Sequence, residues 1–470
     1  MSTRTTRSAS AFPMGASPDG GAARRDRRGR AAALLLAAAA LLPGCSSVMP
    51  SFARGPSVPM GTPGFVTGFF GGVATEEPRA AIVARDILSA GGSAVDAAVA
   101  GAFALSVTLP SRAGLGGGGA CIVYNNRRRE VDAVTFPAGP RSAPPQGADR
   151  PAAVPMMARG LYLLHTRGAR LRFEQLIRPA EDLARFGTEV SRALTDDLAA
   201  VAAPLLNDPN ARAVFGAPGG GPLRPGDRIT QLDLGATLAQ LRTGGVGELY
   251  QGGLSERFAE GSVVAGGGLT QDELRGARAQ VMATERVDVS IDSVYFLPGA
   301  VDGGAGTAQA FQAAMAGQPA LPPVGAPVGA STALLTMDQE GNAVSCAFSM
   351  NNLFGTGRVV PGTGILLAAA PGIGNVPPAP LAVALATNRD RRSFRAVAAG
   401  SGQYAAGAAA GATMAATLRR VAPGDIFAAV PDPGRGMVIT CPSYAPGSNA
   451  SCIGSADPRG TGVSIGTFGR

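Results

Sequence analysis

The sequence predicts an α+β protein, and three patterns indicate this class. Apolar residues recur at helical spacing over residues 80–88. Strand-like apolar runs occur within 120–136 and again within 332–348. The stretch 151–280 is mostly helical in pattern, with Gly/Pro-rich breaks. We therefore expect strands near both ends of the folded part, around a largely helical middle region.

The chain opens with a predicted targeting segment. Residues 1–44 hold seven Arg and two Asp, which is +5 of the formal net charge of +8, and an apolar run extends from Ala31 to Leu42. This run is shorter than the roughly 20 apolar residues that span a bilayer. Followed by Pro-Gly-Cys45, it resembles a bacterial lipoprotein signal that is cleaved before a lipidated cysteine. An ordinary signal peptide with an incidental Cys is the alternative, and both readings export the chain.

Export sets the expected location and partners. We expect a Ser/Pro-rich tether over residues 45–61 and a lipid anchor at Cys45 that holds the protein to the membrane of the bacterial cell envelope, facing the periplasm. Outside the leader only +3 of net charge remains and aromatics are few, so nucleic acid is not an expected partner.

The first elements after the tether are predicted from periodicity and caps. The helix over 80–88 ends at a Gly pair, and Ser93 with Asp96 forms a capping box for a second, buried helix that reaches about Leu105. Later, a helix is predicted from Ala305 to Ala316.

A glycine run at 114–119 formally satisfies the dinucleotide-binding pattern G-x-G-x-x-G. It follows a helix and opens a strand, which is the reverse of the context that the pattern needs. We therefore expect these glycines to permit close backbone packing, not to bind a nucleotide.

The cysteines are interpreted in the light of export, which favours oxidation. Cys441 and Cys452 lie in a Gly/Pro/Ser-rich tail, where we expect a disulfide that stabilises the end of the chain by roughly 2 to 3 kcal/mol. Cys121 and Cys346 lie inside apolar strand-like runs and are expected to be buried small hydrophobes.

The composition excludes several chemistries. The 470 residues, 46% hydrophobic and 16% charged, contain no Lys and a single His, His165. A pyridoxal Schiff base and a P-loop both need Lys, and a zinc site of several imidazoles needs more than one His. His165 lies in an apolar-rich helix, where a structural role is expected. We predict neither a cofactor nor a metal, so the general base of any enzyme here must be unusual.

The most informative stretch begins at Ser331. It follows a breaker-rich linker over residues 317–330 and starts a predicted hairpin whose turn is 338–341. Pairing about this turn puts Ser331 opposite Phe348 or Ser349. Two hydroxyl groups are thus expected to meet at the open end of the hairpin.

A hydroxyl at the start of a strand, after a cleavable linker, is typical of an N-terminal nucleophile. Cleavage before it frees an α-amine with an ordinary pKa of about 7.7 to 8.0, and this amine acts as the base for the adjacent hydroxyl. The mechanism needs neither His nor Lys. The composition fits a non-enzyme equally well.

Several long, collinear segments resemble the γ-glutamyltransferase (γ-glutamyltranspeptidase, glutathione hydrolase) family, of which this chain looks like a divergent member. They cover nearly all of the predicted exported chain, at 91–107, 114–124, 171–191, 226–241, 331–357 and 361–367. The resemblance implies a four-layer αββα sandwich of the N-terminal-nucleophile hydrolase type. It also implies self-cleavage between Ala330 and Ser331 into large (62–330) and small (331–470) fragments that stay associated, and action on γ-glutamyl amides such as glutathione.

The resemblance also assigns the catalytic residues. The family's nucleophilic Thr falls on Ser331, and the Thr after it is kept as Thr332, whereas the His that completes the motif is Ala333. The hydroxyl that supports the nucleophile falls on Ser349, in agreement with the predicted hairpin. The substrate-binding Asn falls on Asn351.

Substrate recognition departs from the family. The Arg that holds the substrate carboxylate is replaced by Pro137, with Arg141 nearby as a substitute, and the acidic residue expected after 361–367 is missing. Losing two charged partners, each contributing about 1.5 to 3 kcal/mol, would weaken glutamyl binding by roughly two to four powers of ten. The glycine pair that supplies oxyanion donors is approximated by Gly400, Ser401, Gly402 and Gln403.

Two hypotheses follow. In the first, Ser331 attacks the carbonyl of a small amide or peptide, with its own amine as base, and hydrolyses or transfers the acyl group, γ-glutamyl or related. In the second, the protein is a catalytically inactive envelope lipoprotein that uses the same fold as a binding or scaffolding module. Self-cleavage before Ser331 distinguishes them.

Overall fold

The computed structural model describes residues 71–139, 141, 145–325 and 329–466. The predicted signal segment 1–44, the lipidation site Cys45 and the tether 45–61 therefore lie outside the described residues and stay predictions.

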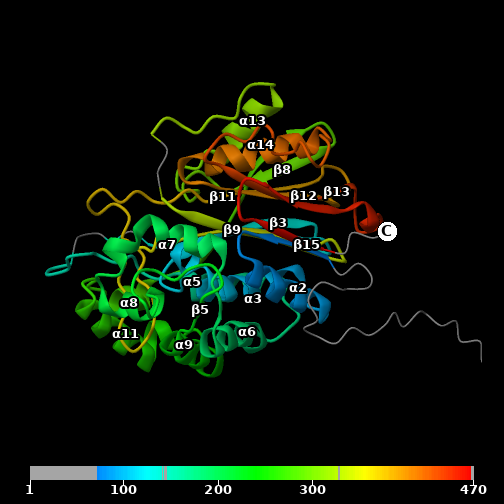
Figure 1. The fold of residues 1–470 in the computed structure, drawn as a ribbon. Coiled ribbons are helices and arrows are strands. Elements are labelled where there is room, and N and C mark those ends of the chain that lie inside the picture. Colours follow the sequence, from blue (N-terminus) through cyan, green and yellow to red (C-terminus); the bar gives the residue numbers. More distant parts are fainter. Residues whose placement is uncertain (1–70, 140, 142–144, 326–328, 467–470) are drawn as a thin grey trace, which may run out of the picture. The chain divides into compact units, whose positions relative to one another are not determined.

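Two antiparallel sheets form the centre of the described unit (Figure 1). The first has the strand order β15-β1-β9-β10-β2-β3-β6, and the second has the order β14-β13-β12-β11-β8-β7. The strands of the first sheet are β1 (Gly71–Thr75), β2 (Gly118–Asn125), β3 (Glu130–Phe136), β6 (Gln280–Met282), β9 (Ser331–Asp338), β10 (Ala343–Ser349) and β15 (Val463–Gly466). Those of the second are β7 (Glu285–Val289), β8 (Asp292–Phe296), β11 (Ala382–Asn388), β12 (Phe394–Ser401), β13 (Arg435–Ala445) and β14 (Ile453–Ala456). A separate pair joins β4 (Thr188–Glu189) and β5 (Arg228–Ile229).

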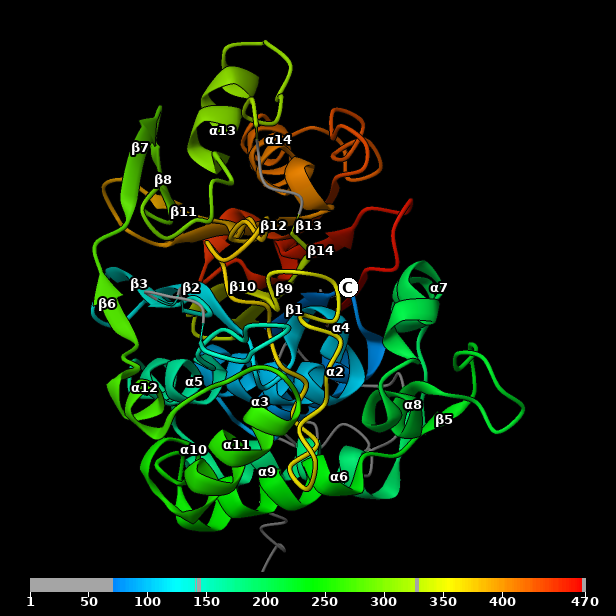
Figure 2. The same cartoon turned by 90° about the vertical axis from the view of Figure 1, so that its left-hand side faces the viewer.

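Helices cover the outer faces of both sheets, which gives the predicted αββα layers (Figures 1 and 2). Helices of the segment 78–276 cover the first sheet. Its helices are α2 (Pro78–Ser89), α3 (Ala94–Thr108), α4 (Pro110–Ala113), α5 (Met157–His165), α6 (Phe173–Phe186), α7 (Arg192–Leu205), α8 (Pro209–Phe215), α9 (Leu232–Gly244), α10 (Glu248–Gln251), α11 (Gly253–Val264) and α12 (Gln271–Gly276). The second sheet is covered by α13 (Thr307–Met315) and α14 (Ala406–Leu418). Short 3₁₀ helices span Gln403–Ala405 and Asn449–Ser451.

The helices and strands that the sequence pattern predicted are present in the structure. Their capping residues and turns agree with the way these elements pack. Ser93 and Asp96 form the predicted capping box at the start of α3, and α3 is buried along its whole length. The predicted hairpin is β9 and β10, and the helical middle region is α5 to α12. The predicted linker before the hairpin is largely exposed where it is described, with Val324 fully exposed.

The two parts of the chain on either side of residue 331 are interleaved. In the first sheet, β9 and β10 lie between β1 and β2, which come from the earlier part. In the second sheet, β11 pairs with β8 from the earlier part. Separating the parts would therefore open both sheets.

The glycine run before and within β2 serves backbone packing, as predicted. A Cβ on Gly117 would lie 2.4 Å from the carbonyl oxygen of Ser349, and one on Gly119 would lie 2.3 Å from that of Ala347. Because the neighbouring backbone occupies the place of any side chain, the glycines let β10 approach closely.

Two disulfides join cysteines within the described residues. Cys441–Cys452 is the predicted one. Cys121 and Cys346 are buried, as expected, but they also form a disulfide, which corrects the expectation that they are only small hydrophobes. The reason is register: Cys121 of β2 lies directly opposite Cys346 of β10, with the Cα atoms 4.0 Å apart.

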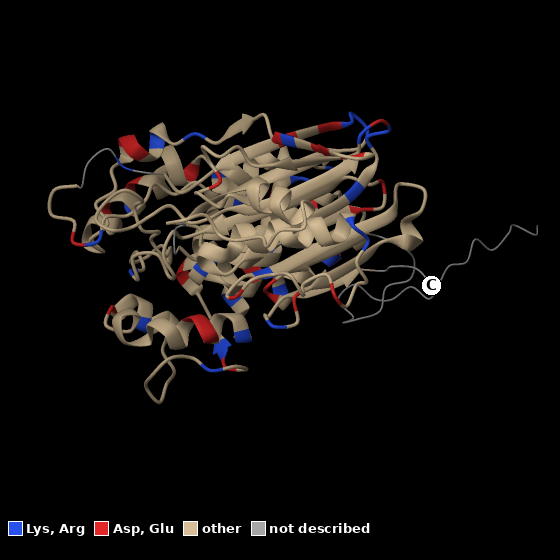
Figure 3. Ribbon diagram, turned by 90° about the horizontal axis from the view of Figure 1, so that it is seen from above, with Lys and Arg blue, Asp and Glu red and all other residues tan. Residues whose placement is uncertain are grey.

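In the view of Figure 3, Arg residues and acidic residues are interspersed along the outer loops and helices of the side that is drawn. None of the helices in the part of the chain that the structure describes has the length and apolar character that crossing a lipid bilayer requires.

Candidate active site

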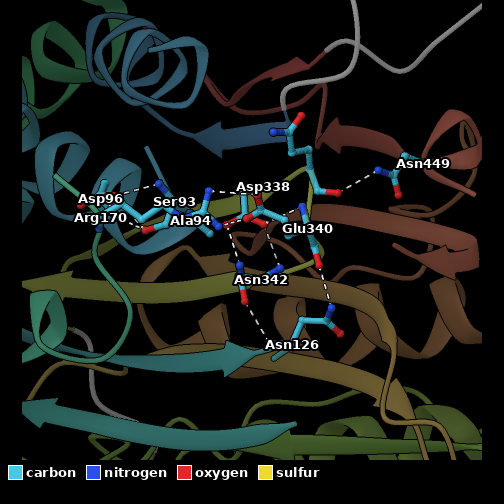
Figure 4. Close-up of polar contacts among 10 residues, drawn as sticks. Ser93, Ala94, Asp96, Asn126, Arg170, Asp338, Glu340, Asn342 and Asn449 are labelled. Carbon is cyan, nitrogen blue, oxygen red and sulfur yellow. Dashed lines mark hydrogen bonds and ion pairs between the residues drawn. The ribbon is translucent and has the colours of Figure 1, made fainter. Parts of the chain in front are cut away.

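The register of the β9–β10 hairpin is fixed by a polar network at its closed end (Figure 4). The carboxylate of Asp338 accepts hydrogen bonds from the backbone N–H groups of Glu340 and Asn342, both at 3.0 Å, and from the N–H of Ala94 at 3.1 Å. Asn126 donates its side-chain amide to the carbonyl of Glu340 at 2.8 Å. These bonds tie the turn to α3 and to the end of β2, so a one-residue slip of the hairpin would break them.

At the open end, this register places Ser331 opposite Ser349. The Ser349 hydroxyl donates a 2.7 Å hydrogen bond to the carbonyl oxygen of Ala330 and accepts one from the backbone N–H of Asn351, also at 2.7 Å. The acceptor carbonyl belongs to the peptide bond that joins Ala330 to Ser331. Ser349 thus polarises the bond at which self-cleavage is expected.

The Ser331 hydroxyl is available to react. Ser331 is 2% exposed, and its Oγ has no hydrogen-bond partner among the described residues. Buried hydroxyl groups are usually paired, so an unpaired one beside a polarised carbonyl is the arrangement expected of a nucleophile.

A buried carboxylate lies beside the nucleophile, and sequence reasoning missed it. Glu76, directly after β1, accepts hydrogen bonds from the hydroxyls of Thr332 at 2.7 Å and Ser401 at 2.6 Å. Thr332 therefore acts through Glu76, since alternation along the strand turns it away from Ser331. Glu76 connects the start of β9 to the end of β12.

Arg112 balances this carboxylate and was also missed. Its guanidinium forms two hydrogen bonds with Asp197, at 2.7 and 2.8 Å, and lies 3.3 Å from Glu76. Burial lowers the pKa of Arg112, but the carboxylates of Glu76 and Asp197 outweigh it, and the pKa rises above its ordinary value. Two carboxylates and one guanidinium leave this cluster with a net charge of −1.

The loop after β12 supplies candidate oxyanion donors. Gly402 and Gln403 have positive φ angles of 102° and 54°, and they lead into the helical turn before α14. Backbone N–H groups at such a helix start are suited to a developing negative charge. Gly400, predicted with them, lies inside β12, where a Cβ would be 2.1 Å from the carbonyl of Ala406. Gly400 is therefore a packing residue, which corrects that prediction.

A charged cavity of about 390 Å³ lies in front of the nucleophile. Ala330 and Ser331 line it together with Ser401, Gly402 and Gln403. Its charged lining residues are Glu76, Arg112, Arg192, Asp196, Asp197, Arg435 and Arg459.

A second cavity, of about 410 Å³, is lined by Ser349, whose hydroxyl donates to the Ala330 carbonyl. Asn351 and Pro137 also line it, and its lining is mainly apolar. Asn351 has a left-handed backbone, with φ 64°, and its side-chain amide donates to the carbonyl of Ala369 at 2.8 Å. Its carbonyl oxygen lies 3.4 Å from the N–H of Ala379.

Arg141, expected as a substitute in substrate binding, lines neither of these cavities but a third, of about 490 Å³, that shares Pro137 and Val301 with the apolar one. Its guanidinium is held by Glu273 through two hydrogen bonds of 2.8 Å and by the backbone carbonyls of Ala152, Gly267 and Gly268. All of its donor groups are thereby used and the side chain is 3% exposed, so Arg141 is a structural residue. This corrects the substrate-binding prediction.

His165 has the expected structural role. Its Nε2 lies 2.8 Å from the carbonyl oxygen of Leu171, and its ring packs against Tyr162 and Phe173. It lines neither the charged nor the apolar cavity.

The layers and the site together define an N-terminal-nucleophile hydrolase fold. The structure is similar to that of a cephalosporin acylase from Bacillus halodurans, with a TM-score of 0.67 at 20% identity, over 87% of this chain and 98% of that one. This likeness concerns the fold.

The chain belongs to the gamma-glutamyltranspeptidase family, whose pattern matches residues 80–318. It is 32% identical over 255 residues to a glutathione hydrolase proenzyme of Escherichia coli, a match that covers 50% of this chain and 43% of that protein. It is 31% identical over 236 residues to the Acylase ACY 1 proenzyme of a Pseudomonas species, over 46% of this chain and 42% of that protein. The chain thus spans less than half the length of these relatives.

Proposed function

We propose that the protein is an amidohydrolase or acyltransferase of the N-terminal-nucleophile type, activated by cleavage of its own chain between Ala330 and Ser331. One observation carries the proposal: the carbonyl of Ala330 accepts a hydrogen bond from Ser349, while the hydroxyl of the next residue, Ser331, is buried and has no partner among the described residues. Nucleophile and electrophile are adjacent, and the electrophile is polarised.

Self-cleavage uses only these groups and water. The Ser331 Oγ attacks the Ala330 carbonyl carbon, its proton passes to the Ser331 nitrogen, and the C–N bond breaks, which leaves an ester and a free amine. Water then hydrolyses the ester and gives the carboxylate of Ala330 and the free hydroxyl of Ser331. Ser349 stabilises the negative charge that develops on the Ala330 oxygen.

Turnover repeats this chemistry on a substrate amide. The freed α-amine takes the proton of the Ser331 hydroxyl as it attacks the acyl carbonyl, and the departing amine receives that proton. The N–H groups of Gly402 and Gln403 stabilise the oxyanion. Water, or another amine in a transfer reaction, removes the acyl group.

The two fragments remain together in this proposal. The interleaved sheets support this, because β9 and β10 lie between β1 and β2. The Cys121–Cys346 disulfide supports it too, since it spans the cleavage point and joins the fragments covalently. The two disulfides also favour the proposed export, because such bonds persist in oxidising compartments.

The substrate is proposed to be a small amide or peptide. The resemblance implies γ-glutamyl amides such as glutathione, but the described site residues include neither of the two charged partners that the family uses for the glutamyl group. The test is release of p-nitroaniline from γ-glutamyl and other acyl anilides by purified protein, with Ser331→Ala as control. Release that is lost in Ser331→Ala supports the proposal. No release from any anilide by a chain that remains uncleaved favours the alternative, a non-catalytic envelope protein.

A further inference from the structure

The apolar cavity that Ser349 and Asn351 line has no charged side chain in the part of its lining that the structure describes. Among the described residues that line it, only Ser349 and Asn351 have polar side chains, and none is charged; the others are Gly, Ala, Pro, Val301 and Leu381. Its volume of about 410 Å³ lies within the range of small-molecule sites.

The two polar side chains are already engaged. Ser349 donates to the Ala330 carbonyl, and the Asn351 amide spans the backbone groups of Ala369 and Ala379. What remains for a ligand to contact is mainly apolar.

Two charged side chains near the lining, Asp302 and Arg141, are committed to partners of their own. Asp302 follows Val301, but its carboxylate is turned into its own loop, where it accepts from the N–H groups of Gly304 and Gly306. Arg141 is held by Glu273 and three carbonyls. A charged ligand group would therefore find no partner of opposite charge among the described residues that line this cavity, which is unfavourable.

The position of the cavity connects it to the nucleophile. Gly329 lies against Asn351 and Ala379, close enough that a Cβ on Gly329 would be 2.5 Å from the Asn351 carbonyl oxygen. The residues just before the scissile bond thus separate the cavity from Ser331. The new carboxyl end that cleavage creates must leave its place before an acyl group in the cavity can reach the Ser331 hydroxyl.

We propose that this cavity is the acyl-binding site and that it takes neutral, apolar acyl groups such as alkanoyl or arylalkanoyl chains. The inference rests on the proposed function and names its substrate class. The acyl chain lies in this cavity with its carbonyl directed toward Ser331, and the amine part of the substrate lies in the charged cavity. Ser331 Oγ forms an ester with the acyl carbon, the amide C–N bond breaks, and water then releases the carboxylic acid.

The first test compares p-nitroanilides whose acyl groups differ in length and charge: butanoyl, hexanoyl, glutaryl and γ-glutamyl. We expect kcat/KM to rise about fourfold for each added methylene of the neutral chains, the factor that corresponds to about 0.8 kcal/mol per buried CH₂. Glutaryl and γ-glutamyl anilides should react at least a hundredfold more slowly than hexanoyl anilide. A preference for either charged acyl group, or no dependence on chain length, overturns the inference and leaves the proposed hydrolase intact.

A variant tests the cavity directly. Val301→Asp adds a charge to its lining, whereas the matched change Val264→Asp adds one at a position on α11 that is 79% exposed. We expect Val301→Asp to lower kcat/KM for hexanoyl anilide at least tenfold, with self-cleavage and melting temperature as in Val264→Asp. Unchanged kcat/KM in Val301→Asp contradicts the assignment.

A binding measurement separates failure of this inference from failure of the proposed function. The cavity is present in the intact chain, so uncleaved Ser331→Ala protein should bind hexanamide in ligand-observed NMR and should not bind glutamine. Binding that is lost in the Ser331→Ala/Val301→Asp double variant supports the acyl site even if the wild-type chain proves uncleaved. No hexanamide binding, or stronger binding of glutamine, overturns it.

Discussion

Replacing Ser349 by Ala should slow self-cleavage strongly and leave the fold intact. The change removes the one hydroxyl that donates to the Ala330 carbonyl, at 2.7 Å. Removing a donor of this kind from a developing oxyanion typically slows a reaction by a factor of about 10² to 10³. The cost in folding stability is about 2 kcal/mol, because the change also removes the acceptor of the Asn351 N–H and two buried hydrogen bonds are lost. Rate and stability should therefore separate.

Ser345→Ala is the matched control. Ser345 lies four residues earlier on β10, is also buried, and donates to a carbonyl of the other sheet, that of Ala398, at 3.0 Å. The assay follows intact and cleaved chain by mass spectrometry after a pulse of cell-free synthesis, with melting temperatures measured in parallel. Ser349→Ala should accumulate precursor while Ser345→Ala cleaves at the wild-type rate. Equal cleavage rates in the two variants would refute the role assigned to Ser349.

Three further predictions concern groups around the site. Glu76→Gln removes a negative charge near the new amine of Ser331, so this amine loses its proton more easily. The rising limb of the pH–kcat/KM profile should therefore move to lower pH by about one unit. An unmoved limb would contradict this role of Glu76. Burial raises the pKa of Glu273, but the hydrogen bonds from Arg141 and Thr270 together outweigh it and leave the pKa below its ordinary value. The stability from these bonds should therefore be present above about pH 4.3 and be lost as pH falls through the lowered pKa. In Glu273→Gln, urea unfolding should lose this acid dependence. After cleavage, the fragments should migrate together in gels without reductant and separate with it, whereas in Cys121→Ser/Cys346→Ser they should separate in both.

The elements that sequence reasoning predicted are those with local signals. The capping box at Ser93 and the turn at 338–341 are each defined within a few residues, and the turn alone limited the partner of Ser331 to Phe348 or Ser349. The structure selects Ser349.

What sequence reasoning missed depends on contacts between distant segments. Glu76 and Arg112 lie 36 residues apart, in short polar interruptions that have no pattern of their own, and they meet only where β1 ends beside α4. Arg141 shows the opposite error. It was predicted to bind the substrate because it lies near Pro137 in the sequence, whereas its guanidinium is held by Glu273, 132 residues away. The Cys121–Cys346 disulfide likewise follows from a strand pairing across 225 residues.

The most direct test of the central claim is amino-terminal sequencing and intact-mass analysis of the purified protein after reduction, which is needed because a disulfide joins the two fragments. We predict two chains, the second beginning Ser331-Thr332-Ala333, and a single chain for Ser331→Ala. A single uncleaved wild-type chain, or cleavage that persists in Ser331→Ala, would contradict the assignment of Ser331 as an N-terminal nucleophile.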